Sequence, residues 1–323
     1  MLPLIGPLAL AASLLACSCA SNREARVPHA PPGVAATSSV SAEPTVAATT
    51  ASFSETAIAR RTGHATAKDG TRLYFEACGA GPAMVFVHGL GGNHAVWFQQ
   101  VAHFAAHHTV VTVSQRGFAP SGGEGARYQV ETLVDDLETV MDAAGVAKAV
   151  VIGQSMGGWT ALGLALQSPG RVTALVLADT LGGISDDEIA VHLRAMTEQA
   201  SRLRAAPPPL GVHPALSAEF SRQHPDLGYL YQTLTTFGAP PADVIARQLA
   251  DARVSPDRLR NLTTPTMFVV GADDRIFPPA IVKKAAAHVP GAQVTVIEGT
   301  GHSPYFESPK AWNFEVGRFL EGI

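Results

Sequence analysis

The sequence has few cysteines and few charged residues. Of its three cysteines, Cys17 and Cys19 lie near the start, so Cys78 has no partner in the rest of the chain. This distribution excludes a disulfide framework. Charged residues make up 15% of the 323 positions, the formal net charge is −4, and the basic residues form no stripe. This charge balance argues against nucleic acid as a partner.

The sequence also lacks the spacings that mark common metal and nucleotide sites. It contains no His-Glu-x-x-His and no paired-ligand spacing. The glycines at 89–92 are not followed by Gly-Lys-Ser or Gly-Lys-Thr, so a phosphate-binding loop is not supported. We therefore expect neither a metal nor another cofactor.

Hydrophobic residues, in contrast, are abundant at 46%. A chain of this length and composition can bury a large core, and one α/β domain of about 200–250 residues is an ordinary size. We expect this domain over 57–323, after a signal peptide at 1–17 and a disordered tether at 18–56.

The first residues are typical of an export signal. The apolar run from Leu2 to Ala16 is too short to span a bilayer comfortably and suits a signal-peptide core. It ends in Leu-Leu-Ala-Cys at 14–17, which resembles the bacterial lipoprotein cleavage box, in which the cysteine is lipid-modified. No Lys or Arg precedes the run, and the alternatives are an ordinary signal cleaved after Ala20 or a misassigned start codon.

The segment Pro31–Ser52 consists almost wholly of Ala, Ser, Thr, Pro, Val and Gly, with Glu43 as its only charge. Such a composition buries too little apolar surface to offset the entropy of ordering. We predict a flexible tether on an exported protein of the bacterial cell envelope. Membrane contact is expected only through a lipid on Cys17; the alternative is a soluble periplasmic or secreted protein.

The most informative stretch is Gly-Gln-Ser-Met-Gly at 153–157. It follows the β-forming run 149–152 and precedes a helical run, 158–166. A serine flanked two residues away on each side by glycine, at a strand-to-helix turn, is a nucleophile elbow. The glycines are needed because strand and helix pass close to the turn, and the serine occupies a strained backbone conformation. The pattern predicts that Ser155 is a nucleophile.

Strands and helices are expected to alternate on both sides of this elbow. Asp69-Gly70 indicates a hairpin, and a helical insert is expected at about 183–262, opened by a capping box at Ser185–Glu188. The expected strands are 63–68, 71–77, 83–87, 110–113, 148–153, 173–179, 266–271 and 293–298; the expected helices are 93–106, 130–144, 215–223, 227–237, 242–252, 279–288 and 308–319.

Acidic residues and a histidine follow the later strands. Asp273 and Asp274 come directly after 266–271, Asp179 ends the strand 173–179, and His302 lies in a Gly-rich loop after the last strand. Active sites of open α/β sheets lie outside the carboxyl ends of the strands, so all four residues are well placed. The order Ser155, Asp274, His302 is the Ser…Asp…His order of the hydrolase elbow fold.

The elbow, His88-Gly89, the Arg116-Gly117 turn and the histidine loop together resemble the α/β-hydrolase superfamily over about 60–323, in particular its small esterase, enol-lactonase and cofactor-free peroxidase branch. The branch usually has Asp two residues before the Arg-Gly turn and Gly-x-Ser after it. Here these positions are Ser114 and Ala119, which affects the details of the loop.

The resemblance implies a mostly parallel eight-stranded sheet with helices on both faces and a helical cap inserted after strand 6. It implies Ser155 as nucleophile, His302 as base and Asp274 as acid, with Asp273 as a turn residue and Asp179 as a lower-ranked acid. It also implies an oxyanion hole built from the N–H groups of Leu90 and Met156.

By these residues, the chain is expected to be a serine hydrolase that cleaves a small-molecule ester or lactone through an acyl-serine. The alternatives are C–C bond hydrolysis or perhydrolysis with the same triad, or a binding protein that kept the fold. His88 is expected to brace its loop, and Glu307 to tie down the histidine loop. Candidate substrate contacts in the cap are Leu193, Met196, Phe220, Tyr229, Leu230, Tyr231 and Phe237.

Overall fold

The computed structural model describes residues 57–123, 128–191, 208–237, 245, 249 and 252–323. The predicted signal peptide, Cys17 and the tether lie outside these residues. The candidate substrate contacts Leu193 and Met196 and the segment 238–244 also lie outside them. None of the helices in the described ranges is long and apolar enough to cross a membrane.

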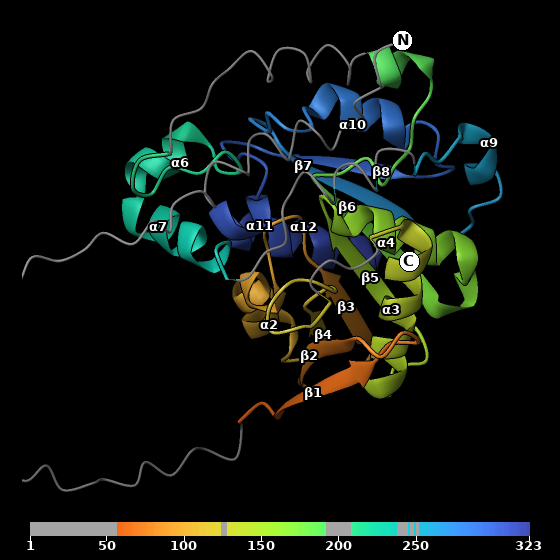
Figure 1. Cartoon of the computed structure of the whole chain (residues 1–323). Helices are drawn as coiled ribbons and strands as arrows, with labels where there is room; N and C mark the ends of the chain where they lie inside the picture. Colours follow the sequence, from red (N-terminus) through yellow and green to blue (C-terminus); the bar gives the residue numbers. More distant parts are fainter. Residues whose placement is uncertain (1–56, 124–127, 192–207, 238–244, 246–248, 250–251) are drawn as a thin grey trace, which may run out of the picture. The chain divides into compact units, whose positions relative to one another are not determined.

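One eight-stranded sheet organises the described chain, with the strand order β1-β2-β4-β3-β5-β6-β7-β8 (Figure 1). The first two strands form an antiparallel hairpin, and β2 also runs antiparallel to β4. The remaining neighbours are parallel. The strands are β1 (Arg60–Thr66), β2 (Arg72–Cys78), β3 (Ala83–Val87), β4 (Thr109–Val113), β5 (Ala149–Gln154), β6 (Val172–Ala178), β7 (Thr266–Gly271) and β8 (Gln293–Ile297).

Helices cover both faces of this sheet because its central strands are apolar on both sides. In β3, Val85 and Val87 belong to the apolar cluster that includes residues of α3, α4 and α10. Met84 and Phe86 belong to the second cluster, with α2 and α12. The helices are α2 (Phe98–Phe104), α3 (Val130–Ala143), α4 (Gly157–Gln167), α10 (Pro279–Ala286), α11 (Pro304–Glu307) and α12 (Pro309–Glu321). The predicted mostly parallel eight-stranded fold is confirmed.

Between β6 and β7 the described residues include the helices α6 (Ala218–Gln223), α7 (Pro225–Leu234) and α9 (Pro256–Leu259). They lie in the sequence range expected for the cap. An isolated parallel bridge between Ile184 and Val254 joins the two ends of this range.

The helical segment expected at 93–106 is present, and Asn93 caps it, since its Oδ1 accepts the N–H of Ala95. The segment begins as a 3-10 turn, η2 (His94–Trp97), and continues as α2 to Phe104. Ser217 caps α6 through the N–H of Phe220, so that helix begins at Ala218 and not at 215.

The capping box at 185–188 was also wrong in detail. Asp186, and not Ser185, caps the helical residues 187–191, since its carboxylate accepts the N–H of Ile189 at 2.7 Å.

Candidate active site

Ser155 lies at the sharp turn from β5 to α4 and has a φ of +49°. Residues other than glycine rarely adopt this left-handed conformation, so the turn holds the serine under strain. A Cβ at Gly153 would collide with the carbonyl of Gly157, and a Cβ at Gly157 would collide with that of Val87. Both flanking glycines of the predicted elbow are therefore required by close backbone packing.

The backbone of the serine is held by β6 and the residues after it. The N–H of Ser155 donates to the carbonyl of Ala178 at 2.9 Å. The hydroxyl of Thr180 donates to the carbonyl of Ser155 at 2.7 Å. The elbow is thus fixed at the carboxyl edge of the sheet.

The loops after β7 and β8 bring Asp274 and His302 together. His302 Nδ1 lies 2.8 Å from Asp274 Oδ2, and both side chains are buried. The other carboxylate oxygen, Oδ1, accepts the N–H groups of Ile276 at 2.7 Å and Phe277 at 3.0 Å. Because Asp274 already accepts from two backbone donors, it is oriented to receive the Nδ1 proton of His302, which leaves Nε2 as a proton acceptor.

Gln154, the residue before the serine, joins the elbow to the histidine loop. Its side-chain Nε2 donates to the backbone carbonyl of His302 at 3.0 Å. The hydroxyl of Ser155 has no hydrogen-bond partner in the part of the chain that the structure describes. Contacts between a nucleophile and its base are often loose without substrate and tighten in the complex.

The glycine-rich loop after β3 approaches the same point. A Cβ at Gly89 would lie 2.9 Å from Cβ of Ser155, so the loop backbone passes directly over the serine. The next residue is Leu90, and the residue after the serine is Met156; both are buried. Among the described residues, neither of their N–H groups donates a backbone hydrogen bond. Two unpaired N–H groups flanking a serine are suited to hold a developing oxyanion.

His88 supports this loop from behind. Its Nε2 accepts the N–H of Gln115 at 3.0 Å, and its Nδ1 contacts the carbonyl of Gly89 at 2.7 Å. Burial lowers the pKa of His88 to about 4, so the ring is neutral at pH 7 and Nδ1 carries the proton. The prediction that His88 braces its loop is confirmed by these contacts.

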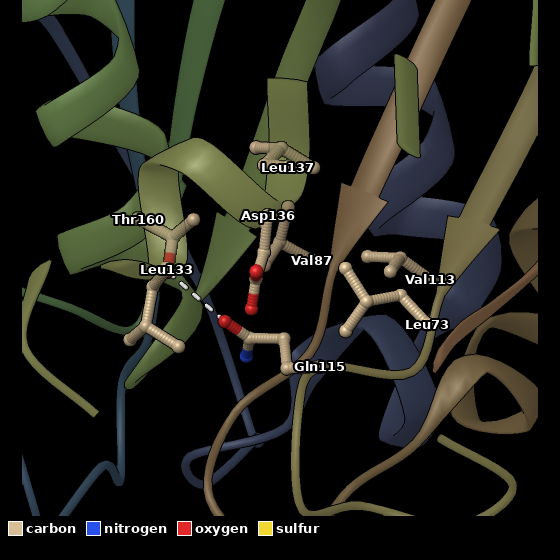
Figure 2. A pocket seen from close by; sticks show the side chains of 8 residues that line it. All are labelled: Leu73, Val87, Val113, Gln115, Leu133, Asp136, Leu137 and Thr160. Carbon is tan, nitrogen blue, oxygen red and sulfur yellow. Dashed lines mark hydrogen bonds between the residues drawn. The ribbon is translucent and has the colours of Figure 1, made fainter. Parts of the chain in front are cut away.

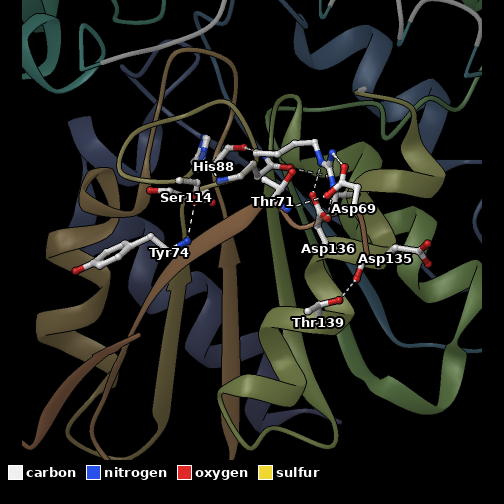
Figure 3. Close-up of polar contacts among 12 residues, drawn as sticks. Asp69, Thr71, Tyr74, His88, Ser114, Asp135, Asp136 and Thr139 are labelled. Atoms are coloured by element: carbon white, nitrogen blue, oxygen red, sulfur yellow. Dashed lines mark hydrogen bonds and ion pairs between the residues drawn. The ribbon is translucent and has the colours of Figure 1, made fainter. Parts of the chain in front are cut away.

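The loop after β4 is anchored by a buried arginine, Arg116. Figure 3 shows Asp69 and Asp136, its two acidic partners, close together. The Arg116 guanidinium binds both oxygens of Asp136 on α3, with Nη2 at 2.7 Å, and Asp69 of the β1–β2 turn at 2.8 Å. The hydrogen bond to Arg116 is the largest of the effects that lower the pKa of Asp69. Three segments far apart in sequence are thereby joined.

Ser121 stabilises the loop at Ser114, the position where the related branch usually has Asp. The Ser121 hydroxyl donates to the carbonyl of Ser114 at 2.6 Å and accepts the N–H of Tyr74 on β2 at 2.7 Å. Ser114 Oγ in turn lies 2.9 Å from Nδ1 of His94. Serine hydroxyls therefore hold this loop where the resemblance would place an aspartate.

Glu307 connects the histidine loop to the residues before β7. Its Oε1 accepts the N–H of Gly301 at 2.9 Å, and its Oε2 accepts that of Ser217 at 2.8 Å. The predicted role of Glu307 in holding the histidine loop is confirmed. Tyr231 of α7 makes a second connection, since its hydroxyl lies 2.8 Å from Oγ of Ser303.

Of the candidate substrate contacts, Phe220 and Tyr231 are buried, while Tyr229, Leu230 and Phe237 are exposed. A cavity of about 10 Å³ lies elsewhere in the described chain. Figure 2 shows its lining residues, Leu73, Val87, Val113, Gln115, Leu133, Asp136, Leu137 and Thr160. The cavity has room for about one water molecule and is far too small for an ester.

Asp179, ranked below Asp274 as a candidate acid, lies close to both Asp274 and His302. One ligand-type atom from each of Asp179, Asp274 and His302 lies within 4.8 Å of the other two. This is the geometry required of a metal site, but the 2.8 Å separation of His302 Nδ1 and Asp274 Oδ2 is a hydrogen-bond distance. Two ligands on one tetrahedral zinc ion would lie about 3.3 Å apart, so the atoms are placed to share a proton.

Sequence reasoning missed Gln154 and Thr180. A polar residue at the end of a buried strand, as at Gln154, is a usable signal, because an amide placed there must find a partner. Thr180 carried no such signal, since its bond to Ser155 depends on how β6 lies against β5.

The architecture and this constellation place the chain in a known class. The family model for the alpha/beta hydrolase fold matches residues 82–309, and the chain belongs to this family. The predicted resemblance is confirmed, and the chain is an enzyme of the hydrolase type.

The similar proteins are named for several substrate classes. The chain is 30% identical to the putative carbamate hydrolase RutD of Caulobacter vibrioides over 245 residues, which cover 72% of this chain and 88% of that protein. A thermophilic esterase from Thermogutta terrifontis superposes with a TM-score of 0.68 at 28% identity, covering 81% of this chain and 98% of the esterase. Est816, an N-acyl homoserine lactone degrading enzyme, has a TM-score of 0.65 at 26% identity, and the match covers 80% of this chain and 100% of Est816.

Proposed function

We propose that the chain is a serine hydrolase that cleaves a carboxylic ester or a lactone through an acyl-serine intermediate. One observation carries the proposal: His302 is bonded to Asp274 at 2.8 Å, and its backbone carbonyl accepts a hydrogen bond from Gln154, the residue before the strained serine. In the reaction, His302 Nε2 removes the hydroxyl proton as Ser155 Oγ attacks the carbonyl carbon. Asp274 keeps the proton of His302 on Nδ1 and stabilises the imidazolium that forms.

The negative charge that develops on the carbonyl oxygen needs preset donors. The unpaired N–H groups of Leu90 and Met156 are the proposed oxyanion hole, and each such donor contributes about 3–4 kcal/mol to transition-state stabilisation. Collapse of the tetrahedral intermediate expels the alcohol, which takes the proton from His302. Water activated by the same histidine then hydrolyses the acyl-serine.

Esters and lactones are the favoured substrates because an esterase and a lactone-degrading enzyme are among the similar solved structures. A carbamate shares the acyl chemistry and is named in a similar curated protein, so it belongs in the same panel. C–C bond hydrolysis and perhydrolysis use the same triad and are the alternative reactions.

The test is hydrolysis of a panel of p-nitrophenyl esters from acetate upward, with lactones and carbamates alongside. We expect Ser155→Ala to lower kcat/KM by several orders of magnitude while circular dichroism remains that of the wild type. Ser168→Ala, at the far end of α4, is the matched control and should retain full activity. Undiminished ester hydrolysis by Ser155→Ala would refute the proposal.

A further inference from the structure

Asp179 occupies an unusual position at the end of β6. It is fully buried and has a φ of +47°, so the backbone is strained to hold a carboxyl group there. Its N–H donates to the carbonyl of Val269 at 2.8 Å, and its Oδ1 accepts the N–H of Gly271 at 2.9 Å. Its other oxygen, Oδ2, has no hydrogen-bond partner among the described residues. A bare carboxylate oxygen in a dry site is costly unless the group is neutral.

Two carboxyl groups share this dry site. Oxygens of Asp179 and Asp274 lie within 4.8 Å of each other, and neither group is exposed to solvent. Like charges at this separation in a buried site cannot both be ionised at low cost, so one group keeps its proton. Asp274 accepts three hydrogen bonds, from Ile276, Phe277 and His302. Asp179 accepts one, which makes it the group that holds the proton.

The other groups around Asp179 agree with this assignment. Burial, and then the Asp274 carboxyl, raise the pKa of Asp179 well above its ordinary value. Glu307, on α11, also raises it, and burial in turn raises the pKa of Glu307. The hydroxyls of Tyr231 and Tyr305 are neutral at pH 7, because burial raises both of their pKa values. Two histidines lie near these groups: His302 is already bonded to Asp274, and His213, whose ring lies 4.9 Å from that of Tyr231, is neutral at pH 7 because burial lowers its pKa to about 3.

We propose that Asp179 is a second, protonated acid of the site, a positioning residue that becomes the partner of His302 when residue 274 lacks a carboxylate. In the wild type its neutral carboxyl fills the space behind Asp274 without repelling it. When Asp274 is replaced by a small apolar residue, Asp179 releases its proton to solvent. The new carboxylate then holds the Nδ1 proton of His302. This inference rests on the proposed serine-hydrolase function.

The test compares four variants by kcat and kcat/KM for an ester between pH 5 and pH 9. Asp179→Asn keeps the acceptor for Gly271 and is neutral like the protonated acid, so it should lose less activity than Asp274→Ala. Loss of all acid support costs about 10⁴-fold in related triads. Asp274→Ala should lose no more than about 10²-fold, and Asp274→Ala/Asp179→Asn about 10⁴-fold.

The pH profile separates a positioning role from a structural one. The ratio of the Asp274→Ala rate to the double-variant rate should rise with pH as Asp179 ionises, because any pH dependence of the base His302 is common to both variants. Equal rates for Asp274→Ala and the double variant would overturn the inference, as would an Asp179→Asn loss as large as that of Asp274→Ala. Ser155→Ala is the fourth variant. If Ser155→Ala stays active, the proposed function fails. If Ser155→Ala is inactive but Asp274→Ala and the double variant have equal rates, only the role of Asp179 is refuted.

A second measurement does not depend on whether Asp274→Ala folds. Infrared spectra of the wild type, labelled with ¹³C at the aspartate carboxyl carbons, are compared at neutral pH with those of Asp179→Asn. We expect the wild type to show the carbonyl band of a protonated carboxylic acid and Asp179→Asn to lack it. A wild-type spectrum with carboxylate bands only would overturn the inference.

Discussion

The side-chain amide of Gln154 donates a hydrogen bond of 3.0 Å to the backbone carbonyl of His302. The residue that precedes the proposed nucleophile therefore holds the loop of the proposed base. The amide oxygen of the same side chain faces Gly89, in the glycine-rich loop after β3. One buried side chain thus contacts both the histidine loop and the glycine-rich loop.

Gln154→Ala should lower kcat by about 10- to 100-fold and leave KM nearly unchanged. Without its amide the His302 loop can shift, and a misplacement of about 1 Å between reacting groups lowers the rate by up to about 100-fold. Steady-state kinetics on the best ester of the panel measure the effect. Gln167→Ala, on the exposed end of α4, is the control and should behave as the wild type. A change in KM alone would show that Gln154 does not position His302.

Glu307→Ala should destabilise the fold and slow the reaction. The substitution leaves the buried N–H groups of Gly301 and Ser217 unpaired, at about 1–3 kcal/mol each. We expect the free energy of unfolding, from urea titration, to fall by about 3 kcal/mol. The control Glu315→Ala removes an i,i+3 surface ion pair with Arg318 and should change the free energy of unfolding by less than about 1 kcal/mol. Equal effects of the two substitutions would contradict the anchoring role of Glu307.

His88 makes stability depend on pH in the acid range. Its pKa in the folded state is about 4, below the ordinary 6.5, so between these values the unfolded chain binds more protons. The stabilisation is complete above pH 6.5 and is lost as the pH falls to about 4, by about 3 kcal/mol in total.

Urea unfolding at pH 7, 6, 5 and 4 tests this contribution. In His88→Gln the decline toward pH 4 should be shallower than in the wild type, and in the exposed control His103→Gln it should be unchanged. Parallel curves for His88→Gln and the wild type would show that His88 is not held neutral by the fold.

The sequence also predicts a lipid on Cys17, a position outside the described residues. In a bacterial host, metabolic labelling with a fatty acid should mark the full-length protein and not Cys17→Ala. Cys19→Ala is the matched control, since it lies two residues away, and it should be labelled normally. Labelling that survives in Cys17→Ala would show that the lipid is not on Cys17, and a full-length protein without label would favour an ordinary cleaved signal or another start.

Local patterns carried much of what the sequence could predict. The elbow glycines are recognisable because their close contacts involve neighbours along the chain or a strand next to β5. Asp274 and His302 each follow an apolar strand in a glycine-rich loop, and their pairing then follows from strands that run parallel. The triad order depends only on such local features.

Contacts between distant segments could not be predicted. Arg116 bonds to Asp136 and Asp69 only because β2, β4 and α3 pack together, and no spacing in the sequence encodes that meeting. Asp179 was ranked below Asp274 by the resemblance, and its closeness to Asp274 appears only in three dimensions. Ser217 was placed inside a helix because a capping serine and a helical serine look alike in sequence.

The central claim is that Ser155 is the nucleophile, and covalent labelling tests it most directly. Wild-type protein incubated with a fluorophosphonate should gain the mass of one adduct, located on Ser155 by peptide mapping, and should lose esterase activity in parallel. Ser155→Ala should gain none, and Ser168→Ala should label as the wild type. An adduct on another residue, or full ester hydrolysis by protein labelled at Ser155, would contradict the account.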